Sequence, residues 1–214
     1  MLKLIDFNFN AALFDLDGVL IDSETEYTRI WSEIGRRFNN PLPDFAQRIK
    51  GMTLDNILNT HFPDHSIHEE IKKVLHDLEF KMVYNWKPGA KELLEFLRDN
   101  GIPRVLVTSS DNLKMQHLKE ERPDLLPLMS DVVTADRISR SKPDPEGYLL
   151  GASLAGTEAK DSLVFEDSLQ GVKAGKNSGA FVVGVAGTLP ESTLLPYSNI
   201  VVNQLTEILE LLKK

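Results

Sequence analysis

Residues 11–20 read AALFDLDGVL, and they give the first indication of the fold class. Residues 11–14 are apolar, and the run ends abruptly in a segment that contains Asp15, Asp17 and Gly18. A short apolar run bounded by turn residues is typical of a buried strand. We therefore expect a strand over residues 11–14 that leads directly into a polar turn.

Three later runs are also apolar and rich in β-branched residues, and they cover residues 104–107, 162–165 and 180–185. Segments of helical period, such as residues 93–100 and 169–178, precede or follow these runs, and a glycine closes each segment. Strands that alternate with helices are typical of a doubly wound parallel α/β sheet, whose ligands bind beyond the carboxyl ends of the strands. We predict this fold class for the core.

The stretch after the first predicted strand breaks the alternation. Its apolar residues recur at helical spacing in two stripes, one over residues 27–38 and the other over residues 67–82. We therefore expect an all-helical cap domain inserted over residues 20–86. The sheet domain is then discontinuous and comprises residues 1–19 and 87–214.

Composition excludes several classes of protein. The formal net charge of -8 disfavours a nucleic-acid partner, because gripping a phosphate backbone requires a surplus of Lys and Arg. The absence of cysteine rules out disulfides, thiolate metal sites and cysteine nucleophiles. No apolar run approaches the length that spans a bilayer. We expect a cytoplasmic protein without a membrane partner, either a monomer or a weak homodimer.

Asp15 and Asp17 are the first candidate site residues. Strand alternation would point both side chains to the same side, where the two carboxylates repel each other. A cation or a shared proton is therefore expected, and one carboxylate can act as a nucleophile while the other exchanges protons. The alternative is that both are ordinary turn residues, since Asp and Gly favour turns.

Three further polar groups follow later strands. Thr108 and Ser109 follow the second strand, Lys142 lies in a proline-flanked turn, and Glu166 with Asp167 ends a later strand. Each group has an ordinary alternative, because hydroxyl and acidic residues cap helices and most lysines are solvated surface residues. Hard oxygen ligands such as the two acids suit Mg²⁺, which substrate phosphate often helps to coordinate.

All four groups fall at the same edge of the predicted sheet, and together they supply the parts that phosphoryl transfer needs. Catalysis of that reaction depends mainly on positioning and on neutralising charge. We expect four acidic residues, from the first and the last of these groups, to bind Mg²⁺: Asp15, Asp17, Glu166 and Asp167. The groups expected to contact substrate phosphate are Thr108, Ser109 and Lys142.

In this order the four groups resemble the motifs of the haloacid dehalogenase-like hydrolase superfamily, and the resemblance spans nearly the whole chain. It implies a Rossmann-like core, a helical cap and Mg²⁺. Matching positions give Asp15 as the nucleophile and Asp17 as the general acid/base. They also give Thr108 as the hydroxyl residue and Lys142 as the motif lysine. Family members that dehalogenate lack the second aspartate, so Asp17 implies phosphate-ester chemistry.

The sequence also resembles the β-phosphoglucomutase and sugar-phosphate phosphatase branch, in part through Lys50 and Gly51, so Lys50 is a candidate substrate contact. Mutases of this branch carry a His and an Arg at cap positions where this chain has Tyr27 and Leu54. We therefore expect a phosphatase of a small phosphorylated metabolite, with a sugar phosphate as the expected class. The alternatives are a phosphomutase and a non-catalytic member that binds a phosphorylated ligand or a protein.

Overall fold

The computed structural model describes residues 2–49, 54–110 and 112–214. The chain divides into two compact units. One unit comprises Met1–Asp22 and Tyr84–Lys214, and the other comprises Ser23–Val83. Among the described helices, none combines the length and apolar character needed to cross a membrane.

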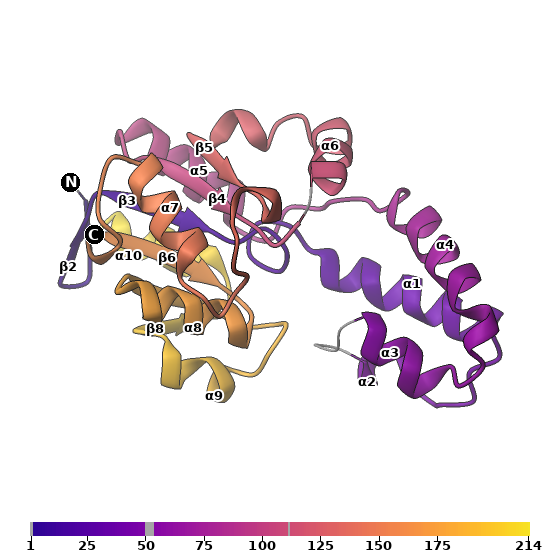
Figure 1. Ribbon diagram of the computed structural model, residues 1–214. Coiled ribbons are helices and arrows are strands. Elements are labelled where there is room, and N and C mark those ends of the chain that lie inside the picture. Colours follow the sequence, from indigo (N-terminus) through magenta and orange to yellow (C-terminus); the bar gives the residue numbers. More distant parts are fainter. Residues whose placement is uncertain (1, 50–53, 111) are drawn as a thin grey trace. The chain divides into compact units, whose positions relative to one another are not determined.

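The first unit is built on a parallel sheet of six strands (Figure 1). In spatial order these are β5 (Asp131–Val133), β4 (Arg104–Val107), β3 (Ala11–Phe14), β6 (Ser162–Glu166), β7 (Phe181–Val185) and β8 (Ile200–Val202). The four predicted strands are confirmed, and the structure adds β5 and β8 at the edges. Every residue of β3, β4 and β6 is buried, because helices cover both faces of the sheet.

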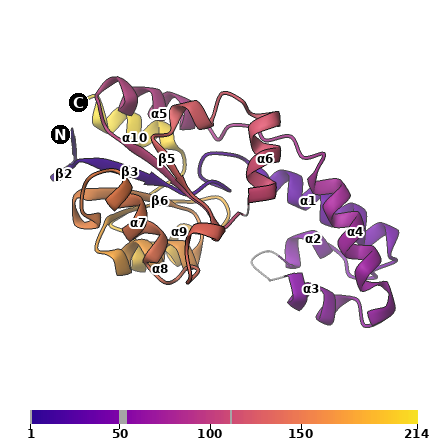
Figure 2. The same cartoon turned by 45° about the horizontal axis from the view of Figure 1, so that its top comes forward.

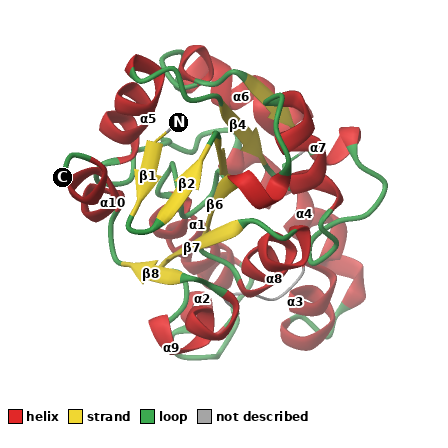
Figure 3. Ribbon diagram, turned by 90° about the vertical axis from the view of Figure 1, so that its left-hand side faces the viewer, coloured by secondary structure: helices red, strands yellow, loops and turns green. Residues whose placement is uncertain are grey.

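Helices lie on both faces of this sheet, which confirms the predicted doubly wound α/β class (Figures 2 and 3). One face carries α5 (Ala90–Asp99) and α10 (Leu205–Leu212), and the other carries α7 (Glu146–Leu154) and α8 (Leu169–Ser178). The apolar stripe of α5 faces inward, so that Leu93, Leu94 and Leu97 have no exposed surface. The order of the strands brings β3 between β4 and β6. The polar segments that follow these three strands therefore meet at one edge.

The remaining elements of this unit are a hairpin and further helical segments. An antiparallel hairpin of β1 (Leu2–Leu4) and β2 (Phe7–Phe9) precedes the sheet, and α6 (Asn112–Glu121) follows β4. The others are α9 (Glu191–Leu194), η2 (Leu126–Leu128), η3 (Ala135–Arg137), η4 (Ala159–Asp161) and η5 (Leu195–Tyr197). Beneath the site the rings of Phe14 and Phe165 stack with centroids 4.5 Å apart, which fixes β3 against β6.

The second unit is helical. It contains α1 (Ser23–Arg37), α2 (Phe45–Arg48), α3 (Leu54–His61), η1 (His65–Ile67) and α4 (His68–Glu79). The predicted stripes lie mainly on α1 and α4, and several of their apolar residues are buried in the interior of the unit. Ile30 and Ile34 of α1 and Ile71 of α4 have no exposed surface. Burial of these stripes holds the unit together, because short helices are marginal on their own in water.

Candidate active site

Asp15 stands at the first position after β3. Its backbone N–H donates to the carbonyl of Phe165 at 3.0 Å, which extends the β3–β6 pairing to the edge of the sheet. The Asp15 side chain is largely buried there. The chain then turns sharply at Gly18, whose φ is +77°. A Cβ atom at Gly18 would stand 1.8 Å from Oδ2 of Asp167, so only glycine lets the two acidic segments approach this closely.

The Lys142 side chain contacts one residue of the first motif and one residue of the last motif. Its Nζ atom lies 2.5 Å from Oδ1 of Asp15 and 2.6 Å from Oε1 of Glu166, and it also donates to the carbonyl of Val107 at 3.3 Å. The Lys142 side chain is 12% exposed. Burial works to lower the pKa of Lys142, but the charges of Asp15 and Glu166 raise it well above its usual value. Lys142 is therefore a fixed positive charge between two carboxylates.

Glu166 is completely buried at the end of β6. Its Oε1 atom accepts from Lys142 and from the hydroxyl of Tyr148 at 2.8 Å. Its Oε2 atom accepts from the backbone N–H groups of Asp167 and Ser168 at 3.1 Å each, and from the Ser168 hydroxyl at 3.0 Å. Both oxygens are thus held by several donors, so Glu166 organises the site around it.

Asp167 lies next to Glu166 and is also buried. Its Oδ2 atom accepts from the hydroxyl of Thr188, in the segment after β7. Burial raises the pKa of Asp167 well above its usual value, and the charges of Glu166 and Asp15 add to this effect, although the Thr188 hydrogen bond works against it. Asp167 is therefore a carboxylate that is costly to ionise without a nearby cation.

Three carboxylates converge at this edge. Oxygen atoms of Asp15, Glu166 and Asp167 all lie within 4.8 Å of one another. Burial, with the charges of Glu166 and Asp17, raises the pKa of Asp15 to about 7, although Lys142 works to lower it. A divalent cation bound by oxygen ligands would relieve this repulsion, and the donor set suits Mg²⁺. The residues present therefore fit the predicted metal.

Asp17 has a different partner. Its Oδ2 atom accepts from Nζ of Lys114, on α6, at 2.7 Å. Burial works to lower the pKa of Lys114, but the charge of Asp17 and the hydrogen bond raise it above its usual value. The Asp17 carboxylate, which the sequence analysis counted among the metal ligands, is not part of the convergent group of Asp15, Glu166 and Asp167.

The remaining predicted contacts lie nearby or outside the described residues. Thr108 is buried directly after β4, and its hydroxyl donates to Oγ of Ser110 and accepts from the Ser110 N–H, both at 3.0 Å. Ser109 is exposed beside it. Lys50 lies outside the residues that the structure describes. The structure thus brings Asp15, Lys142, Glu166 and Asp167 into one cluster, with Thr108 next to the Val107 carbonyl that Lys142 contacts.

Comparison with known proteins agrees with this arrangement. A family profile described as haloacid dehalogenase-like hydrolase matches residues 9–179. The chain belongs to this family. The resemblance inferred from the four motifs is therefore confirmed, and the chain is a haloacid dehalogenase-like hydrolase.

Relatives of this hydrolase cover nearly its whole length. Validoxylamine A 7'-phosphate phosphatase of Streptomyces hygroscopicus subsp. limoneus is 33% identical over 211 residues, which is 94% of this chain and 96% of the relative. A phosphorylated carbohydrates phosphatase of Thermotoga maritima is 31% identical over 225 residues, or 95% of this chain and 98% of the relative. The crystal structure of a candidate β-phosphoglucomutase from Thermotoga maritima has a TM-score of 0.80 at 30% identity, covering 96% of this chain and 99% of that one.

Three residues of the hydrolase site were missed by sequence reasoning. They are Lys114 on α6, Tyr148 on α7 and Thr188 after β7. None of them lies in a motif. Each side chain is brought to the site by the way its own helix or loop packs. For Tyr148 a signal was available, because a tyrosine in a helix that covers the sheet must find a partner for its hydroxyl when buried.

Proposed function

We propose that this hydrolase is a Mg²⁺-dependent phosphatase that transfers the phosphoryl group of a small phosphorylated metabolite to Asp15 and then to water. The proposal rests mainly on one observation: Lys142 contacts Asp15 and Glu166, which are two of three converging carboxylates. A nucleophile, a fixed positive charge and a set of hard oxygen ligands are together what phosphoryl transfer requires.

In the first step, a carboxylate oxygen of Asp15 forms a bond to phosphorus as the bond from phosphorus to the leaving oxygen breaks. Asp17 donates a proton to that leaving oxygen, so the product departs as an alcohol. Lys142 holds the attacking carboxylate and offers positive charge to the phosphoryl oxygens. Thr108 and Ser109 donate hydrogen bonds to the same oxygens in this proposal.

In the second step, water attacks phosphorus, and the bond between phosphorus and the Asp15 oxygen breaks. Asp17 takes a proton from the attacking water and is ready for another cycle. Free phosphate leaves and Asp15 regains its carboxylate. The same residue thus donates a proton in one half of the reaction and accepts one in the other.

Asp15 and Asp167 are the residues that we assign to Mg²⁺, with Glu166 completing the acidic group behind them. When bound, the ion would neutralise the carboxylates and the substrate phosphate. Oε1 and Oε2 of Glu166 already accept from protein donors, so its part is to hold Lys142 and the Asp167 and Ser168 backbone in place. We assign Asp17 to proton exchange and not to the ion, because Lys114 holds its carboxylate outside this acidic group.

The helical unit supplies the substrate selectivity in this proposal, in the manner of a cap. It contains a cavity of about 350 Å³ that Glu24, Tyr27, Trp31, Ile57 and Glu79 help to line. The hydroxyl of Tyr27 donates to Oε1 of Glu79 at 3.1 Å. Carboxylate, hydroxyl and aromatic groups around an apolar cavity suit a hydroxylated ligand.

Sugar or polyol phosphates are the substrate class that we favour. One phosphatase compared above is named for phosphorylated carbohydrates and the other for validoxylamine A 7'-phosphate, and their identity of 31% and 33% extends over nearly the whole chain. A phosphomutase would return the phosphoryl group to the sugar, whereas a phosphatase releases it. We propose release, in the cytoplasm, by a monomer or a weak homodimer.

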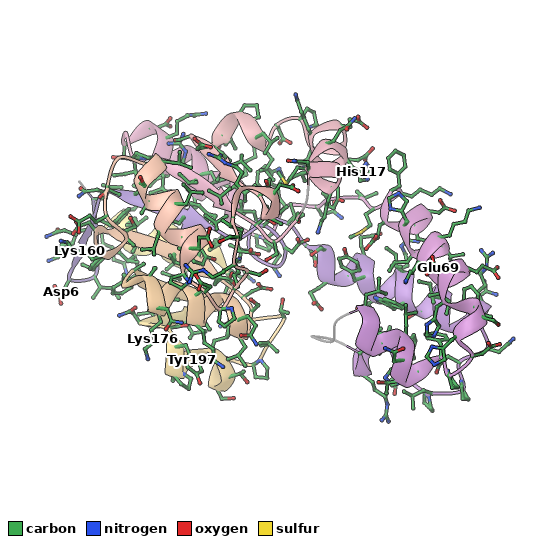
Figure 4. All side chains as sticks on the ribbon, viewed as in Figure 1. Asp6, Glu69, His117, Lys160, Lys176 and Tyr197 are labelled. Atoms are coloured by element: carbon green, nitrogen blue, oxygen red, sulfur yellow. The ribbon has the colours of Figure 1, made fainter. Side chains whose placement is uncertain are left out.

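The function can be tested with a panel of phosphate esters and Mg²⁺. Asp15→Asn should lose at least about a thousandfold in turnover, because the nucleophile is removed. Asp6→Asn is the matched control, because Asp6 is an exposed aspartate in the hairpin turn, where it pairs with Lys3 at 3.2 Å (Figure 4). Equal rates for wild type and Asp15→Asn would remove Asp15 from the mechanism. An isomerised sugar phosphate in place of free phosphate would identify a mutase.

A further inference from the structure

Lys114 contacts the aspartate to which we assign proton transfer. It lies in the first turn of α6, directly beyond the carboxyl end of β4, and its Nζ atom donates to Oδ2 of Asp17 at 2.7 Å. The Lys114 and Asp17 side chains are 23% and 31% exposed, so the pair lies at the rim of the site and not on the open surface. Because both side chains are only partly exposed, water does not fully screen the contact.

Packing within the first unit fixes the face of α6 from which Lys114 extends. His117 lies one turn further along α6 (Figure 4) and is buried. Its ring stands 5.4 Å from that of Tyr84, which is 2% exposed. Met115 and Leu118 are buried as well. Residues three positions apart share a helix face, so the contact that holds His117 also sets the direction of Lys114.

The two aspartates of the first motif are thus held by two different lysines. Lys142 contacts Asp15 and Glu166, whereas Lys114 contacts Asp17. A carboxylate without such an anchor can rotate, and a nearby cation would draw it into the acidic group. The hydrogen bond to Oδ2 fixes that rotation and therefore the direction of Oδ1.

We propose that Lys114 is a positioning residue, which holds Asp17 out of the Asp15, Glu166 and Asp167 group and aims its Oδ1 atom at the leaving oxygen. The inference rests on the proposed function, because it acts through proton transfer by Asp17. The proton on Oδ1 passes to the leaving oxygen as the bond to phosphorus breaks, and Oδ1 receives a proton from water in the second step.

Esters with different leaving groups separate this role from a structural one. The leaving group of an alkyl ester such as glycerol phosphate is a strongly basic alkoxide unless an acid protonates it. The leaving group of p-nitrophenyl phosphate is the weakly basic p-nitrophenolate, which departs without protonation. If Lys114 acts through Asp17, Lys114→Met should lower kcat on the alkyl ester about tenfold more than on the aryl ester. Loss of folding or of general site order would lower both rates by the same factor.

Matched variants complete the experiment. Lys114→Arg keeps the charge and should recover part of the alkyl-ester rate, and Lys114→Gln provides a second neutral variant if Lys114→Met unfolds. Lys119→Met is the control, because Lys119 is exposed on the same helix. Thermal melts establish that each variant is folded at the assay temperature.

Asp17→Asn separates failure of the inference about Lys114 from failure of the proton-transfer role of Asp17. A selective loss on the alkyl ester in both Asp17→Asn and Lys114→Met supports the inference. A selective loss in Asp17→Asn, with equal losses on both esters or none in the neutral Lys114 variants, overturns the inference and leaves the proposed function standing. Equal losses on both esters in Asp17→Asn overturn the proton-transfer role of Asp17, and the role of Lys114 with it.

Discussion

The Nζ atom of Lys142 lies 2.6 Å from Oε1 of Glu166, and the Glu166 side chain has no exposed surface. A buried carboxylate without a partner is very costly, so this contact supports both the fold and the site. Because the same Nζ atom also contacts Asp15, the ion pair sets where the nucleophile stands. Stability and chemistry therefore depend on the same lysine.

Removing this lysine should destabilise the protein strongly. We expect Lys142→Met to lower the free energy of unfolding by about 3 to 5 kcal/mol, because it leaves Glu166 buried without its cation. The double variant Lys142→Met/Glu166→Gln should regain part of that loss. Denaturant titration measures both. Lys160→Met is the control, because Lys160 forms an exposed pair with Glu158, and a loss there as large as in Lys142→Met would contradict the account.

The stability of the metal-free protein should depend on the ionisation of Asp15. Its pKa in the folded state is raised to about 7 from a usual value of 3.8, mainly by burial, so the folded state binds this proton more tightly than the unfolded chain. The contribution of Asp15 to stability is therefore lost as the pH rises from about 4 to about 7. Asp15→Asn removes this dependence.

Comparison of wild type with Asp15→Asn across this pH range isolates the effect. The variant should gain stability relative to wild type as the pH rises, by at most about 4 kcal/mol, and the difference should level off above pH 7. Adding Mg²⁺ should stabilise wild type more than the variant. If the difference in the free energy of unfolding between wild type and variant is constant from pH 4 to pH 8, the pKa of Asp15 is not raised in the folded state.

Tyr148 provides a test of the packing around Glu166. Its hydroxyl donates to Oε1 of the buried carboxylate at 2.8 Å, and its ring has no exposed surface. Tyr148→Phe should lower the free energy of unfolding by about 1 to 3 kcal/mol, because Glu166 loses a donor that water cannot replace. Tyr197→Phe, at a half-buried tyrosine, should change the denaturation midpoint far less. Equal midpoints for the two variants would argue against the hydrogen bond.

Gly18 should be required for activity and not only for the turn. Gly18 and Gly156 both have positive φ, at +77° and +73°, so alanine at either position should cost about 1 kcal/mol of strain. At Gly18 the added Cβ would also meet Oδ2 of Asp167, whereas at Gly156 it has no neighbour within 4 Å. Gly18→Ala should therefore lose phosphatase activity while Gly156→Ala keeps it. Similar turnover in both variants would place Asp167 outside the site.

Much of the fold could be predicted from the sequence because its signals are local. The apolar runs that form β3, β4, β6 and β7 each end at a polar turn, and a parallel sheet places such ends on one edge. The strands β5 and β8 were not predicted. Each has only three residues at an edge of the sheet, where burial is less complete and the apolar pattern is weaker.

Part of the site could not be predicted, because it depends on contacts between residues far apart in sequence. The approach of Asp15, Glu166 and Asp167 follows from neighbouring strands, so motif spacing was enough. The direction of the Asp17 carboxylate depends on Lys114, which is 97 residues away in the sequence. No sequence motif predicts how the helix that carries Lys114 packs. Thr188 reaches Asp167 from the segment after β7 for the same reason.

The central claim is that Asp15 carries the phosphoryl group between substrate and water. The most direct measurement quenches the enzyme in acid during turnover of a phosphate ester with Mg²⁺, reduces the trapped acyl phosphate with borohydride, and maps the peptides by mass spectrometry. The account predicts a homoserine at the position of Asp15 and at no other acidic residue. A reduced residue at another position, or none in an enzyme whose Asp15→Asn variant turns over as fast as wild type, would contradict it.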